Sequence, residues 1–223
     1  MTPPEFQSFL DRCAAFHDGV CEAVDALTPY PEPRYAVALQ SGRLSIEHGI
    51  AAHALISANL AAPGITLLRT QFETLVRAVW LMYAASDAWV DKLGGPLTIE
   101  TVESGNDTPM LAKMLQGLRA SEGAPPALLD QLESCRDAHW KALNSYAHGG
   151  LHPLARSATG YPLKLCYDVL RNSSGLTALA AQLCAIVSGK PLAMVPIRAL
   201  HENYRDVLPI IEPPAQTTTR TRQ

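Results

Sequence analysis

The sequence predicts an all-α protein, a helical bundle of about six to eight helices with an up-down core. Two observations favour this fold class. Apolar residues recur at spacings of three and four through most of the 223 residues, which is the period of an amphipathic helix. No segment alternates polar and apolar residues between hairpin turn signals, as a strand of a sheet would.

The first part of the chain is predicted to form three long helices. Residues 6–27 carry a single apolar stripe and precede a run of prolines that cannot continue an α-helix. Residues 35–60 form the second helix, which is expected to stop at Pro63-Gly64. Residues 65–85 are apolar around most of the helix circumference, which is typical of a central helix in a bundle.

An irregular crossover is expected over residues 94–105, where glycine, proline and scattered polar residues replace the periodic pattern. Four further helices are predicted over residues 109–121, 127–147, 162–188 and 194–207. Residues 1–211 are therefore expected to form one domain. The polar segment 212–223 is expected to be a disordered tail.

Composition limits the classes of function. A net charge of −3 gives no global attraction to nucleic acid or to anionic membranes, so such binding requires a local patch. Five cysteines without a C-x-x-C pair disfavour a disulfide framework and a cysteine zinc site. The charge-free runs 49–68 and 172–189 are interrupted by polar residues, so no membrane span is predicted. We expect a cytoplasmic protein, because the N-terminus lacks the pattern of a signal peptide.

A charged stripe crosses the apolar third helix. Arg69, Glu73 and Arg77 are spaced four apart and therefore share one face. One interpretation is a solvated stripe with two weak ion pairs. The other is that the arginines meet an anion, a phosphate or a facing carboxylate, for which Glu47 on the second helix is the candidate.

The end of the helix over residues 127–147 gathers the most reactive side chains. Asn144 and His148 lie one turn apart on one face, and Gly149-Gly150 follows as a stop in which Gly149 is the candidate left-handed cap. His152 lies just beyond this break. The alternative is that His148 only caps the last carbonyl groups of the helix.

Metal and cofactor sites receive weaker support. A three-histidine site from His48, His148 and His152 is conceivable in a bundle. The chain has no phosphate-binding loop, no dinucleotide glycine fingerprint and no G-x-S-x-G elbow, so no cofactor is predicted.

Two segments carry a family resemblance, one running from residues 44–49 through 69–80 and the other spanning 143–153. Over about residues 35–210 the chain resembles a group of uncharacterised bacterial all-helical proteins that are classed only as a domain of unknown function. That resemblance implies an all-helical fold and no particular activity.

More distantly, a polar residue followed four places later by histidine at a helix end is similar to the HEPN class of helical domains. Many HEPN proteins are metal-independent ribonucleases of toxin and defence systems that work as dimers. Their signature is arginine, a polar residue, three residues and histidine. Asn144 and His148 match it, whereas Leu143 occupies the arginine position. The resemblance implies that His148 is a general acid or base at the scissile phosphate. Arg77 and Arg69, which come from another helix, are the candidates to replace the missing charge.

The leading hypothesis is a cytoplasmic, homodimeric HEPN-like protein that binds RNA or another anionic ligand and cleaves RNA if it is an enzyme. Its alternatives are a non-catalytic binding or interaction module with a buried polar network and, third, a metal-dependent bundle enzyme. The predicted catalytic residues are His148, Asn144 and Arg77, and the predicted ligand-binding residues are Glu47, Arg69, Glu73 and His152.

Overall fold

A computed structural model describes residues 1–101 and 108–210 of the chain. These residues form nine α-helices and two short 3-10 helices and include no β-strand, which confirms the all-α fold class. The helices are α1 Pro3–Asp25, α2 Pro33–Ser57, α3 Ala61–Tyr83, α4 Asp87–Gly94, α6 Leu111–Arg119, α7 Pro126–Ala147, α8 Leu151–Thr159, α9 Leu163–Val187, η1 Pro191–Ala193, α10 Met194–Asn203 and η2 Arg205–Val207. The predicted tail, residues 212–223, lies outside the described residues, as do residues 102–107 of the predicted crossover.

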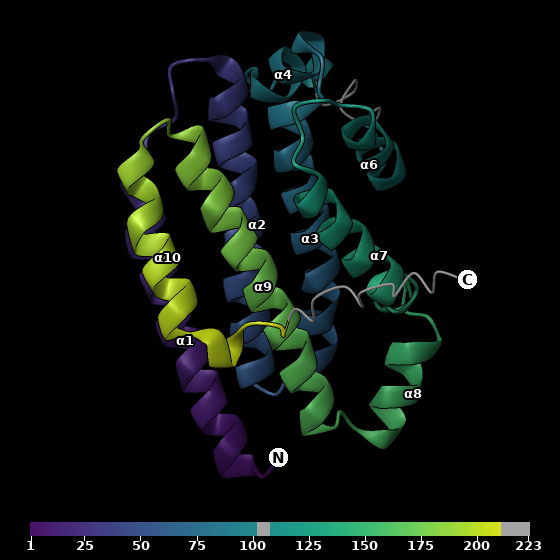
Figure 1. The fold of residues 1–223 in the computed structure, drawn as a ribbon. Coiled ribbons are helices and arrows are strands. Elements are labelled where there is room, and N and C mark those ends of the chain that lie inside the picture. Colours follow the sequence, from purple (N-terminus) through teal and green to yellow (C-terminus); the bar gives the residue numbers. More distant parts are fainter. Residues whose placement is uncertain (102–107, 211–223) are drawn as a thin grey trace, which may run out of the picture.

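Helices α2 and α3 form an antiparallel pair, and α9 packs against both of them. On one side of this unit, α1 and α10 cover α9, while α6 and α7 pack on the other side of α3 (Figure 1). Helix α3 is therefore central, as its apolar circumference predicts, and thirteen of its residues are buried. Within the described residues, no helix combines the length and the apolar character needed to cross a bilayer.

The helix count exceeds the predicted six to eight because α4 and α8 were not expected. Helix α4 has eight residues and α8 has nine, and no residue of α8 is buried. Helices this short, lying at the surface, leave too few core contacts to produce a periodic apolar pattern. The predicted end of the second helix also differs. Asn59, with φ of 61°, ends α2, and Pro63 lies in the first turn of α3, where proline is tolerated.

A buried polar contact joins the three central helices. The Gln71 side chain on α3 is fully buried and its Nε2 donates to the Ser173 carbonyl and to Thr177 Oγ1, both at 3.0 Å. The Ser173 hydroxyl donates to Gln71 Oε1 at 2.7 Å. Gly49 on α2 lies against this amide, because a Cβ there would fall 2.6 Å from Gln71 Nε2 and from Thr177 Oγ1. The three helices therefore fit closely only with glycine at this position.

We expect Gly49→Ala to lower the free energy of unfolding by roughly 1–3 kcal/mol, since the added methyl group must displace a hydrogen-bonded pair. Urea unfolding of the full chain measures this change. Gly117→Ala is the matched control, because its Cβ would meet nothing closer than 3.6 Å. In α6 that substitution should be neutral or should stabilise by about 0.5–1 kcal/mol. Equal effects of the two substitutions would contradict the close packing at Gly49.

A second buried polar side chain has no partner. His17 on α1 is 4% exposed, and neither ring nitrogen has a hydrogen-bond partner in the described part of the chain. The ring lies edge-on to His53, whose Nε2 donates to the Leu10 carbonyl at 2.9 Å. Burial, together with the neighbouring His53, lowers the pKa of His17 to about 4. The ring is therefore neutral in the folded protein at neutral pH.

Because the folded-state pKa lies below the ordinary value, His17 contributes to stability above pH 6.5, and this contribution is lost as the pH falls toward 4. The lowered pKa corresponds to about 3 kcal/mol between pH 7 and pH 4. We expect the free energy of unfolding of His17→Leu to fall less over this range than that of the original chain. Urea titrations at pH 7, 5.5 and 4 test this, and parallel pH dependence in the two proteins would contradict it.

Candidate functional site

Two predicted site residues meet between α3 and the end of α7. Arg69 Nη1 lies 3.1 Å from His148 Nε2. A guanidinium group only donates hydrogen bonds, so Nε2 is the acceptor in this contact. His148 is exposed at the C-cap of α7. Its ring therefore contacts an arginine of another helix, which the capping alternative did not include.

Arg69 is held on two further sides. Its Nη2 donates to Glu73 Oε1 at 3.3 Å, and its guanidinium carbon lies 4.9 Å from the centre of the Trp140 ring. The Arg69 side chain is 22% exposed and that of Glu73 is 30% exposed. Cation–π contact and an i,i+4 ion pair each orient the guanidinium, although exposure limits the energy of the pair. The group is thus positioned while remaining accessible to solvent.

The glycine pair ends α7 at a defined place. Gly149 has φ of 62°, and the N–H of Gly150 donates to the Ser145 carbonyl at 2.7 Å. Together with the 3.4 Å bond from Gly149 N–H to the Tyr146 carbonyl, this is a Schellman motif. The predicted left-handed cap at Gly149 is confirmed. The motif fixes His148 as the last residue before the chain turns into α8.

His152 lies on α8 and does not join His148. Its backbone N–H donates to Ser145 Oγ at 3.0 Å. Its ring stacks on Tyr146, with 6.2 Å between the ring centres. The turn at the glycine pair therefore separates the two histidines, as a break in the helix between them implies.

Asn144 lies one turn before His148 and is half-buried. Its Oδ1 is buried and has no hydrogen-bond partner in the described residues. This oxygen is closed to solvent, so a ligand reaches it only if neighbouring side chains move. The preceding residue, Leu143, is 5% exposed and belongs to the apolar core.

The charged stripe of α3 lines a cavity of about 370 Å³. Arg69, Glu73 and Arg77 all contribute to its wall, with Arg136 and Trp140 from α7 and residues 108–112 and 114 opposite. Arg77 lies in the cavity, two turns along α3 from Arg69. The arginine that meets His148 is therefore Arg69, which was predicted as a ligand-binding residue, and not Arg77.

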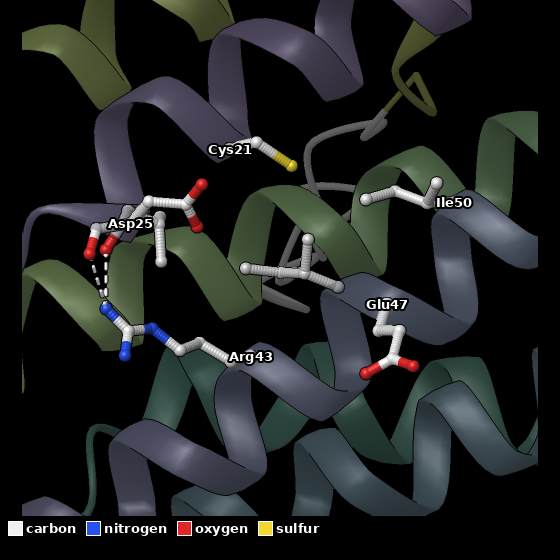
Figure 2. A pocket seen from close by; sticks show the side chains of 7 residues that line it. Cys21, Asp25, Arg43, Glu47 and Ile50 are labelled. Carbon is white, nitrogen blue, oxygen red and sulfur yellow. Dashed lines mark hydrogen bonds between the residues drawn. The ribbon is translucent and has the colours of Figure 1, made fainter.

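Glu47 is separated from this stripe. It lines a different cavity, of about 250 Å³, together with Cys21, Asp25, Arg43 and Ile50 (Figure 2). The Arg43 guanidinium reaches the end of α1, where its Nη2 donates to the carbonyl groups of Val24, Asp25 and Leu27 at 2.9–3.0 Å. Glu47 is exposed on α2, and it is not the carboxylate that faces the arginine stripe.

The possible metal site of His48, His148 and His152 is not formed in the described part of the chain. Among residues 1–101 and 108–210, no group of three or more histidine, cysteine, aspartate or glutamate side chains is placed to hold a metal ion. His48 lies on α2, and burial lowers its pKa below the ordinary value. The described residues thus give no geometric support to a His48, His148 and His152 site.

Sequence reasoning missed Trp140 and Arg136 as site residues. Trp140, Asn144 and His148 are spaced four apart, so the helical period alone places Trp140 on the same face of α7. Arg136 extends that face by one more turn. This four-residue spacing is visible in the sequence, but it points to the site only once α7 is known to pack on α3.

Residues 42–210 match a family of unknown function, DUF6988. The chain belongs to this family. The match includes the stripe on α3 and the end of α7, and it confirms the predicted resemblance to a domain of unknown function. No curated protein and no solved structure matched the chain.

Proposed function

We propose that this DUF6988 protein is a metal-independent ribonuclease with a HEPN-like up-down core, acting as a cytoplasmic homodimer. The observation that carries this proposal is the 3.1 Å contact between Arg69 Nη1 and His148 Nε2. It supplies, from α3, the positive charge that the HEPN signature places where Leu143 stands. Asn144 and His148 keep the positions of the polar residue and the histidine.

The groups present suit cleavage by the neighbouring ribose hydroxyl. In the proposed reaction the phosphate of the RNA replaces His148 as the acceptor of the Arg69 hydrogen bond, which frees the lone pair of His148 Nε2. That nitrogen removes the proton of the 2′-hydroxyl, whose oxygen attacks the adjacent phosphorus. The bond from phosphorus to the 5′-oxygen breaks, and water protonates that oxygen. The hydroxide that is left takes the proton from His148, so the products are a 2′,3′-cyclic phosphate, a 5′-hydroxyl and the regenerated histidine. Arg69 stabilises the charge that develops on the phosphate oxygens.

Local charge supports an anionic substrate. The chain has a net charge of −3, so binding of RNA depends on a positive patch. Arg69, Arg77 and Arg136 line the cavity beside His148, and Glu73 is the only acidic residue among the described residues that line it. This excess of guanidinium groups favours phosphate over neutral ligands.

A second candidate is a non-catalytic binding module, which is favoured by the internal contacts of Arg69. Glu73, His148 and Trp140 already engage its guanidinium. In that case Arg69 and these three residues hold α3 against α7. The original chain then shows no cleavage, and Arg69→Ala lowers the melting temperature. This alternative expects a buried network of Glu47, Arg69, Glu73, Arg77, Asn144 and His148. The buried network of the central helices consists of other residues, Gln71, Ser173 and Thr177.

Cleavage of end-labelled single-stranded RNA in excess chelator tests the proposal. We expect the original chain to cleave and His148→Ala to lose about 10²-fold or more of the rate, which is the scale of general acid–base catalysis. Arg69→Ala should lose a similar factor, and Arg69→Lys should recover only part of it. Product ends are identified by phosphatase and kinase treatment, which distinguishes a cyclic phosphate from a contaminating nuclease with other products.

Arg198→Ala is the matched control, since Arg198 is exposed on α10, on the opposite side of the bundle (Figure 1). It should cleave like the original chain. Circular dichroism and melting temperature establish that each variant is folded. Background cleavage that is identical in the original chain, His148→Ala and Arg198→Ala would sink the ribonuclease proposal.

A further inference from the structure

We infer that the cavity between α3, α6 and α7 binds one nucleotide, with its phosphate on Arg77 and Arg136 and its base against an apolar wall. The inference deepens the proposed function and rests on it for the choice of a nucleotide among anionic ligands. It concerns residues other than the Arg69–His148 pair, because neither Arg77 nor Arg136 is hydrogen-bonded to His148 within the described part of the chain. It identifies a subsite next to the bond that is cut.

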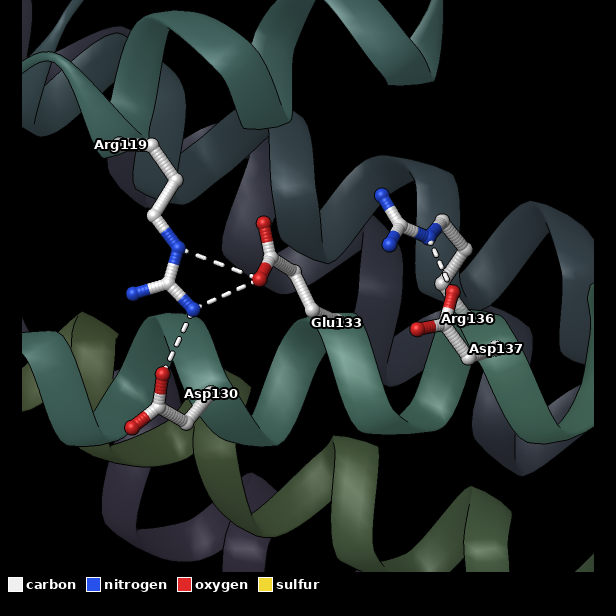
Figure 3. A network of polar contacts seen from close by, with 5 residues as sticks. All are labelled: Arg119, Asp130, Glu133, Arg136 and Asp137. Carbon is white, nitrogen blue, oxygen red and sulfur yellow. Dashed lines mark hydrogen bonds and ion pairs between the residues drawn. The ribbon is translucent and has the colours of Figure 1, made fainter.

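Two guanidinium groups in this cavity have N–H donors that are not used in hydrogen bonds within the described residues. Arg77 forms no hydrogen bond and no ion pair with any other described residue, although it is half-buried and lines the cavity. Arg136 uses only its Nε, which donates to the neighbouring Asp137 at 2.8 Å. Figure 3 shows its two terminal nitrogens directed away from that carboxylate. Two forked donors of this kind match the oxygens of one phosphate group.

Apart from Glu73 and Thr108, the rest of the wall is apolar. Met110, Met114 and Trp140 line the cavity, and Met110 is 72% exposed at its edge. Phe72 supports the indole from its edge, with 6.3 Å between ring centres. Methionine side chains adapt in shape to the flat face of a base, and aromatic rings stack on it. Base–aromatic stacking tolerates different bases.

Glu73 gives the cavity an acceptor between the arginines. Its Oε1 accepts from Arg69, and its second carboxylate oxygen has no partner among the described residues. That oxygen suits a ribose hydroxyl or a base N–H, which inorganic phosphate and simple organic phosphates lack. The cavity of about 370 Å³ falls in the range of small-molecule sites. Charge, apolar wall and acceptor together fit a nucleoside monophosphate better than phosphate alone.

The wall that faces α3 is fixed by ion pairs between α6 and α7. Arg119 on α6 donates to Asp130 and Glu133 on α7, each at 2.6 Å (Figure 3). The bond from Arg119 holds the pKa of Glu133 below its ordinary value. These pairs are exposed and individually weak, but they connect α6 and α7, which supply cavity residues together with α3.

Isothermal titration of the full chain with adenosine monophosphate, adenosine and inorganic phosphate tests the inference. We expect adenosine monophosphate to bind at least tenfold more tightly than either of the other probes. Arg77→Gln and Arg136→Gln should each weaken its binding about tenfold, since each removes charge-assisted hydrogen bonds. Arg198→Gln, on the far side of the bundle, is the matched control and should bind like the original chain.

Equal affinity for adenosine monophosphate and inorganic phosphate would overturn the inference in favour of a simple anion site. The absence of binding, or binding unaffected by Arg77→Gln and Arg136→Gln, would also overturn it. His148→Ala separates the two proposals, because it should lose RNA cleavage and keep nucleotide binding. A chain that binds the nucleotide without cutting RNA contradicts the ribonuclease alone. A chain that cuts RNA without binding the nucleotide contradicts the subsite alone.

Discussion

The buried amide of Gln71 is the contact on which the arrangement of the central helices depends. It joins α3 to α9 through Ser173 and Thr177, and Gly49 of α2 leaves just enough space for it. An unpaired amide at this depth would cost several kcal/mol, so the register of α3 against α9 is strongly constrained. Residues two apart on a helix point about 200° apart. With Gln71 directed to α9, Arg69 and Glu73 are directed to the opposite side, where α7 lies.

The backbone conformation at the end of α7 positions His148. Because Gly149 adopts positive φ, the helix stops at His148 and the chain turns away into α8. Trp140, two turns earlier, packs on Phe72 and beneath the Arg69 guanidinium, which sets how α7 lies along α3. The histidine is therefore level with the arginine because a core contact, an aromatic contact and a helix stop act on the same pair of helices.

The sequence alone was sufficient to predict the long helices. It also indicated the charged stripe on α3 and the end of α7 as candidates, but not which residues of other helices contact them. Periodicity shows which face of α3 carries Arg69, yet it does not show which helix covers that face, so Glu47 was paired with the stripe although it lies at another cavity. The Gln71 network joins residues 102 and 106 positions apart, a separation that no local pattern encodes. Helices α4 and α8 were not predicted, because these short surface helices bury almost no side chains.

Leu143 shows how the Arg69–His148 pair differs from a motif within one helix. In an arginine-to-histidine signature, one helix fixes the separation of the two groups, whereas here Leu143 is buried in the core and the charge comes from α3. The separation then depends on the α3–α7 contact, and Arg69 belongs both to the pair and to the cavity wall. In the proposed reaction the phosphate competes with Glu73 and His148 for the guanidinium. That ion pair is 3.3 Å long and partly exposed, so breaking it costs little, while Trp140 keeps the arginine in place.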